Sequence, residues 1–184
     1  MKFFKLVLAL VTLALLAPAS QAQTFSVVLN GPNESPANAS PGTGTGTVIF
    51  DTTAHTMFIT VSFTGLTGTV TASHIHAATA VPFTGTAGVA TQLPTFTGFP
   101  LGVTAGTYTN TFNMALIASF NPTFVTNNGG TAASAETALV AAAVAGKSYL
   151  NIHTSTFGGG EIRGFLGTAP EPGTVALALL GLPV

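Results

Sequence analysis

The sequence of 184 residues has the length of one ordinary domain, and it is unusually poor in charge. Asp, Glu, Lys and Arg make up only 5% of the residues, against about a quarter in a typical soluble domain, so the surface has to be built from Thr, Ser, Asn and Gly. This composition excludes a coiled coil, and four basic residues are too few for a nucleic-acid-binding surface. The absence of Cys excludes disulfides, thiolate nucleophiles and cysteine metal ligands.

Residues 1–22 have the pattern of a cleaved secretory signal peptide. Lys2 and Lys5 come before an apolar run over residues 6–17, and Ser20-Gln21-Ala22 has the small-x-small form of a signal peptidase site. The apolar run is shorter than the roughly 20 residues that a membrane-spanning helix needs. We therefore expect an exported mature chain, without a stable membrane span, that begins near Gln23.

Residues 23–168 form the predicted domain, in which short stretches of alternating apolar and polar residues are separated by Gly, Pro and Asn. The clearest buried face is formed by Met57, Ile59, Val61 and Phe63. Strands are predicted at 25–29, 46–51, 56–64, 70–77, 88–93, 106–114, 148–153 and 161–167. About eight short strands of this kind predict an all-β fold, either a sandwich or a barrel. Of the two, we expect a Greek-key antiparallel β-sandwich.

One short helix is predicted near residues 132–145, which are rich in Ala. Glu136 lies near its start and Gly146 directly after its end, as expected for a short capped helix. The segments 94–105 and 121–131 are predicted to be loops, because Pro and Gly recur in the first and Asn-Pro and Asn-Asn-Gly-Gly occur in the second.

Residues 169–184 are set apart from the domain by Pro170-Glu171-Pro172, which is followed by an apolar run over 175–182. This pattern resembles the PEP-CTERM sorting signal of Gram-negative bacteria that make exopolysaccharide. In that family a transmembrane helix and a cluster of arginines follow the motif, so the tail here resembles a truncated copy. The resemblance implies a secreted or envelope-associated protein of a Gram-negative bacterium. A last strand or an apolar tail is the alternative.

The strongest polar constellation is His74-Ile75-His76 in a predicted strand. Residues two apart in a strand lie about 6.6 Å apart on one face, so His74 and His76 can converge on one ion while Ile75 points to the core. Histidine pairs of this kind also occur as structural residues that are hydrogen-bonded to neighbouring strands. His55, beside a predicted turn, is expected to be an exposed hairpin residue.

A second polar group lies near the end of the domain. If Leu150 and Ile152 face the core, then Tyr149, Asn151 and His153 occupy the other face of that strand. By the same alternation, Ile162 faces the core while Glu161 and Arg163 face away from it.

Two hypotheses account for these residues. Three imidazoles from His74, His76 and His153 are a sufficient ligand set for one zinc or copper ion, and Glu161 could orient one of them. Alternatively Asn151, Glu161 and Arg163 form a polar network with the histidines, in which Glu161 pairs with Arg163 or with a histidine. The sequence favours the network, and therefore no cofactor.

No catalytic residues are predicted. The sequence has no Gly-x-Ser-x-Gly motif, and its single Asp lies at a predicted turn, so a Ser-His-Asp triad is hard to assemble. The candidate carboxylates for glycoside hydrolysis are dispersed over predicted turns and a helix. Catalytic activity is therefore not indicated.

The two polar groups belong to a set of segments that resembles a known family. These segments are 25–36, Gly65-Leu66, His74-Ile75-His76, Tyr149-Leu150-Asn151-Ile152-His153-Thr154 and Gly160-Glu161-Ile162-Arg163-Gly164. Together they resemble the CHRD domain in order and spacing over nearly all of residues 24–167. The family is named after chordin, an extracellular antagonist of growth factors, and it occurs in exported bacterial proteins. The resemblance implies an extracellular β domain without implying a reaction.

A weaker, fold-level analogy links the His-x-His pair and the expected sandwich to Cu/Zn superoxide dismutase. That enzyme holds two metals with six histidines and an aspartate, whereas this chain has four histidines. A two-metal site cannot be built, and only a mononuclear site remains as an alternative.

The sequence therefore predicts an exported binding or structural module of the cell envelope or extracellular matrix. The expected partners are exopolysaccharide or an extracellular protein, recognised through an uncharged, Thr-rich surface, and nucleic acid is not expected. The alternative function is mononuclear binding of zinc or copper.

Overall fold

The computed structural model describes residues 22–168, and its fold is all-β, as predicted. The predicted tail and all but the last residue of the predicted signal peptide lie outside the described residues. The strands are β1 (Gln23–Asn30), β2 (Thr43–Asp51), β3 (Thr56–Thr64), β4 (Val70–His76), β5 (Gly106–Asn113), β6 (Tyr149–Thr154), β7 (Ile162–Phe165) and β8 (Gly167–Thr168). The helices are α1 (Pro122–Asn127), α2 (Ala132–Val144) and two single 3-10 turns, η1 (Gly31–Asn33) and η2 (Ile117–Ser119).

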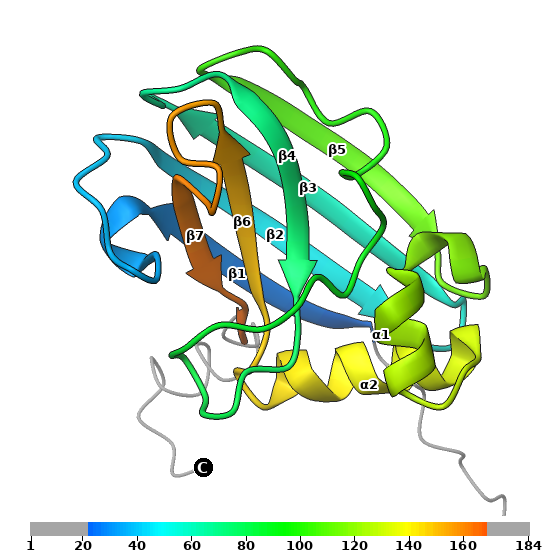
Figure 1. Cartoon of the computed structure of the whole chain (residues 1–184). Helices are drawn as coiled ribbons and strands as arrows, with labels where there is room; N and C mark the ends of the chain where they lie inside the picture. The colour runs from blue at the N-terminus through cyan, green and yellow to red at the C-terminus, as the bar shows by residue number, and fades with distance from the viewer. Residues whose placement is uncertain (1–21, 169–184) are drawn as a thin grey trace, which may run out of the picture.

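The strands are hydrogen-bonded into one sheet in the order β4-β6-β7-β1-β2-β3-β5, and β8 also pairs with β1. The sheet is antiparallel throughout. It curls strongly, so that β4, β6 and β7 lie in front of β2, β3 and β5 (Figure 1). The two halves thus face each other across a core, which is consistent with the expected sandwich.

The core is built from alternate residues of the facing strands. Met57, Ile59, Val61 and Phe63 of β3 are all buried, as their spacing predicted. From the opposite half, Ile75 of β4 and the β6 pair Leu150 and Ile152 are completely buried. Since Ile75 faces the core, His74 and His76 must lie on the outer face of β4.

The helix predicted near 132–145 is confirmed as α2, which lies across one end of the curled sheet (Figure 1). Thr131 and Ser134 form a reciprocal capping box at its start. Gly146 follows its end with a left-handed φ of 66°. Among residues 22–168, no helix is long and apolar enough to cross a membrane.

Two local predictions were wrong. Residues 88–93 form only isolated bridges, in which Val89 pairs with His76 and Thr91 with Phe120. The segment 121–131 is not all loop, because it contains α1. The Asn121 side chain accepts a hydrogen bond from the Thr123 amide, and Pro122 occupies the first turn, so Asn-Pro here starts a helix.

A long connection between β4 and β5 runs back along the free edge of β4. The amides of Ala90, Phe96 and Gly102 donate to the carbonyls of Ile75, Ser73 and Val70, respectively. This connection covers an edge that would otherwise be free to pair with another chain. It also places backbone carbonyl groups beside the histidines of β4.

Candidate metal centre

Histidines from two neighbouring strands meet on the outer face of the sheet. Antiparallel pairing of β4 with β6 sets Ala72 opposite His153 and His74 opposite Asn151. The ring of His74 lies 5.3 Å from that of His153 and 5.9 Å from that of His76, and the rings of His76 and His153 are 6.1 Å apart. One nitrogen from each imidazole lies within 4.8 Å of the others. The structure therefore brings the three predicted ligands together.

Each of these imidazoles is held by a backbone carbonyl. His74 Nε2 lies 2.7 Å from the Pro94 oxygen, His76 Nδ1 lies 2.9 Å from the Ala87 oxygen, and His153 Nδ1 lies 2.9 Å from the Gly158 oxygen. Because a carbonyl can only accept, the imidazole nitrogen must donate. The other nitrogen of a neutral imidazole then carries a lone pair.

The three remaining nitrogens are buried and have no hydrogen-bond partner. They are His74 Nδ1, His76 Nε2 and His153 Nε2. Three lone pairs close to one another cannot satisfy one another, since each is an acceptor. A shared cation would satisfy all three, and the carbonyl contacts are those that commonly orient metal-ligating histidines.

The surroundings of His74 and His76 favour the neutral form of these two imidazoles. Burial lowers the pKa of His74, and it lowers the pKa of His76 to about 4. The hydrogen bonds to Pro94 and Ala87 oppose this effect, whereas the neighbouring histidines reinforce it. Neutral imidazoles are the form that binds a metal ion, and three of them suit zinc or copper.

Arg163 supports the cluster indirectly, through an aromatic ring. The Tyr149 ring stacks on His76 with centroids 4.7 Å apart, and the Arg163 guanidinium lies 4.6 Å from the Tyr149 centroid. Arg163 donates hydrogen bonds to the Asn33 and Gly85 carbonyls. By stacking over Tyr149, Arg163 helps to hold the ring that packs against His76.

The expected pairing of Glu161 with Arg163 or with a histidine was wrong. The acid beside Arg163 is Glu34, whose Oε2 lies 3.8 Å from Arg163 Nε. Glu161 precedes β7 and therefore does not follow the alternation of the strand.

Glu161 instead accepts hydrogen bonds at one end of the molecule. The donors are the hydroxyls of Ser40 and Thr154, each at 2.6 Å, and the amides of Thr67 and Gly68. Burial would raise the pKa of Glu161, but these four hydrogen bonds outweigh it and lower the pKa. Glu161 thus connects the β1–β2 and β3–β4 loops to the end of β6, and none of its hydrogen bonds is to a histidine.

His55 lies outside the cluster, in the turn between β2 and β3. Its side chain is half exposed, as expected of a hairpin residue, but it also forms a hydrogen bond with the carboxyl group of Glu136 in α2. The distance between His55 Nδ1 and Glu136 Oε2 is 2.6 Å.

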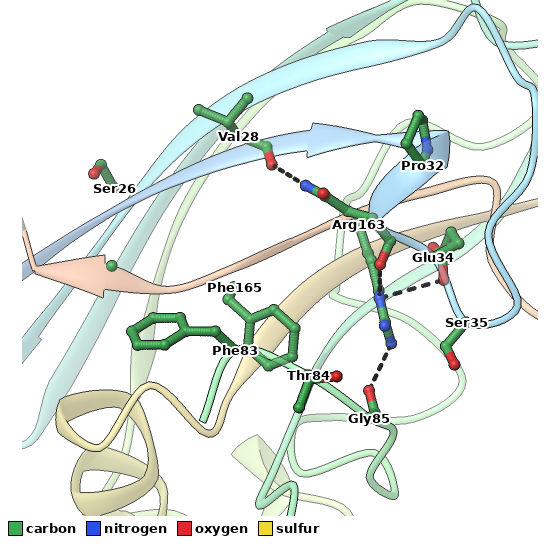
Figure 2. Close-up of a pocket in the computed structure, with 12 residues that line it drawn as sticks. Ser26, Val28, Pro32, Glu34, Ser35, Phe83, Thr84, Gly85, Arg163 and Phe165 are labelled. Carbon is green, nitrogen blue, oxygen red and sulfur yellow. Dashed lines mark hydrogen bonds and ion pairs between the residues drawn. The ribbon is translucent and has the colours of Figure 1, made fainter. Parts of the chain in front are cut away.

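A cleft of about 580 Å³ opens beside Arg163. Figure 2 shows Arg163 at its centre, reaching toward Glu34 and Gly85, with the Phe83 and Phe165 rings on one side. Burial raises the pKa of Glu34 to about 7, although the Arg163 charge lowers it in part. The sequence did not point to this cleft, because Glu34, Gly85 and Arg163 are distant in the chain and no local pattern links them.

Comparison with known proteins identifies one family. Neither the curated proteins nor the solved structures yielded a match. The model of the CHRD domain matches residues 25–166, which include β2 to β7, most of β1 and all three residues of the histidine cluster. A match over most of the chain confirms the resemblance noted in the sequence, and the chain belongs to the CHRD domain family.

Proposed function

We propose that this CHRD domain is an exported binding module that holds one zinc or copper ion through His74, His76 and His153. The observation that carries the proposal is the set of three buried imidazole nitrogens, within 4.8 Å of one another, that lack any hydrogen-bond partner. A purely structural network would be expected to satisfy these atoms internally.

The alternative of a metal-free network loses support from the same contacts. Glu161 and Arg163 have other partners, so neither supplies a charge or a donor to the imidazoles. Asn151 remains beside the cluster, but its side-chain oxygen also lacks a partner.

Export is supported by the sequence of residues 1–22 and by the Pro-Glu-Pro tail. We infer a place in the cell envelope or extracellular matrix of a Gram-negative bacterium, with exopolysaccharide or an extracellular protein as the partner. The cleft beside Arg163 is the best candidate contact, because it combines a cation with the exposed ring of Phe83. No reaction is proposed, and the ion would have a structural role.

Metal content of the full chain, recovered after export and without an affinity tag, tests the proposal. We expect about one zinc or copper ion per chain by mass spectrometry, and loss of that ion in the His74→Ala/His76→Ala variant. Chelation should lower the melting temperature of the wild type, because an ion at 100 times its Kd stabilises the fold by about 2.7 kcal/mol.

His55→Ala is the matched control, since it removes a histidine outside the cluster. It should retain the ion. A wild type that takes up no zinc or copper after export or after reconstitution would refute the proposed function.

A further inference from the structure

One further polar group lies unsatisfied beside the three histidines. Six buried side-chain atoms in residues 22–168 lack a hydrogen-bond partner, and four of them come from His74, His76, His153 and Asn151. Asn151 is only 2% exposed, and its unpartnered side-chain atom is the oxygen Oδ1. An amide oxygen, like the three free nitrogens, offers a lone pair and no proton.

The position of Asn151 in the sheet places it in the middle of the cluster. It is directly opposite His74 across the β4–β6 pair and two residues from His153 on the same face of β6. The third histidine, His76, faces Tyr149, the neighbour of Asn151 on that same face.

The orientation of the amide group follows from the loop before β7. A Cβ atom placed on Gly160 would lie 2.9 Å from Asn151 Nδ2 and 2.5 Å from Glu34 Oε1. The amide nitrogen thus faces Gly160, on the side where the carboxyl group of Glu34 lies. The oxygen Oδ1 is on the other branch of the amide, so it is directed away from Gly160.

We propose that Asn151 Oδ1 is the fourth ligand of the ion held by His74, His76 and His153. This inference rests on the proposed function. Three imidazoles and one amide oxygen complete a four-coordinate site without water, as in structural zinc sites. An oxygen ligand also favours a divalent ion such as zinc over copper(I), which prefers sulfur.

Cobalt(II) is a suitable probe, because its visible spectrum reports the number and kind of its ligands. The full chain, freed of metal and loaded with cobalt, would be compared with Asn151→Ala and Asn151→Asp. Azide would be added to each, since it can bind only where the ion has an open or water-filled position.

We expect azide to leave the wild-type spectrum unchanged and to change that of Asn151→Ala, whose cobalt affinity should fall by about 10-fold or more. Asn151→Asp keeps an oxygen at this position, so it should bind cobalt and resist azide. If Asn151→Ala does not fold, a shifted cobalt spectrum in Asn151→Asp still tests direct ligation.

An azide-sensitive wild type would show an open position and refute the ligand role while leaving the metal site intact. Cobalt affinity that is unchanged or higher in Asn151→Ala would also refute it, because an amide turned to donate to His76 would compete with the metal. A wild type without cobalt bands would refute both the ligand role and the proposed function.

Discussion

Glu34 and Glu161 are both buried carboxyl groups, and their surroundings shift their pKa values in opposite directions. Glu161 accepts four hydrogen bonds, which lower its pKa, whereas Glu34 Oε1 has no partner. The Arg163 guanidinium lies 3.8 Å from Glu34, which is too weak a contact to offset burial, so the pKa of Glu34 rises to about 7. Hydrogen bonds to the charged form, more than burial alone, therefore decide the charge state of each acid.

The raised pKa of Glu34 predicts a loss of stability as the pH rises. Between about pH 4.5, the ordinary pKa of a glutamate side chain, and pH 7 the folded protein binds this proton more tightly than the unfolded chain, so the unfolding free energy falls with pH. We expect a decrease on the order of 3 kcal/mol from pH 4.5 to 8. Glu34→Gln should remove most of it. Urea denaturation of the wild type and of Glu34→Gln at a series of pH values, with a chelator present, measures the unfolding free energy of each. If the two proteins lose the same stability between pH 4.5 and 8, the prediction is contradicted.

The elements bring the histidines together because β4 and β6 are neighbours in the sheet. Each strand has a simple alternation, with Ile75 in β4 and Ile152 in β6 facing the core. The antiparallel register then sets the polar faces side by side. A slip of one residue in either strand would turn its histidines toward the core, so the apolar residues also hold the site in place.

The junction between α2 and β6 gives a prediction at the scale of the element. Gly146 ends α2 with a left-handed φ of 66°, and a methyl group there would collide with the Phe83 ring. Gly146→Ala should therefore lower the unfolding free energy by about 2 kcal/mol. Urea denaturation is the measurement.

Two further variants separate the causes of this loss. Gly88→Ala is the control, because that position has open space and no left-handed backbone, and it should be nearly neutral. Adding Phe83→Ala to Gly146→Ala should recover the steric part of the loss. Equal denaturation midpoints for Gly146→Ala and Gly88→Ala would disprove the argument.

The whole molecule combines a curled sheet with loops whose carbonyl groups contact the histidine cluster. The carbonyls that hold the imidazoles belong to Pro94, Ala87 and Gly158, all outside the strands. An ion at the histidines would therefore fasten both the β4–β5 connection and the β6–β7 loop to the sheet. Binding of the proposed ion would then affect the order of both loops.

Hydrogen–deuterium exchange tests that effect. Removal of the ion should speed amide exchange in residues 85–96 and 155–160, while β1, β2 and β3 stay protected, because these strands supply neither the histidines nor the carbonyls that hold them. The His74→Ala/His76→Ala variant should show the fast pattern with or without chelator. Uniform exchange changes across the sheet, or none at all, would argue against that effect.

The amino-acid sequence alone predicted the elements whose pattern is local. Alternation identified β3 and the core side of β4 and β6, and the Ala-rich segment before Gly146 identified α2. The same alternation placed His74, His76 and His153 on the outer faces of their strands. Even the failures at 88–93 and 121–131 concern short segments, where a few residues carry too little pattern to distinguish a strand, a helix and a loop.

Only the tertiary structure decided how these elements meet. The pairing of β4 with β6 joins residues about 75 positions apart in the sequence. The alternation within one strand does not indicate which other strand it will pair with. The partners of the polar groups were equally non-local: Arg163 lies beside Glu34, and the imidazoles are held by loop carbonyls that any residue type could supply. Side-chain periodicity is a property of one strand, whereas a metal site depends on distances between strands and loops, and those distances exist only once the sheet has curled.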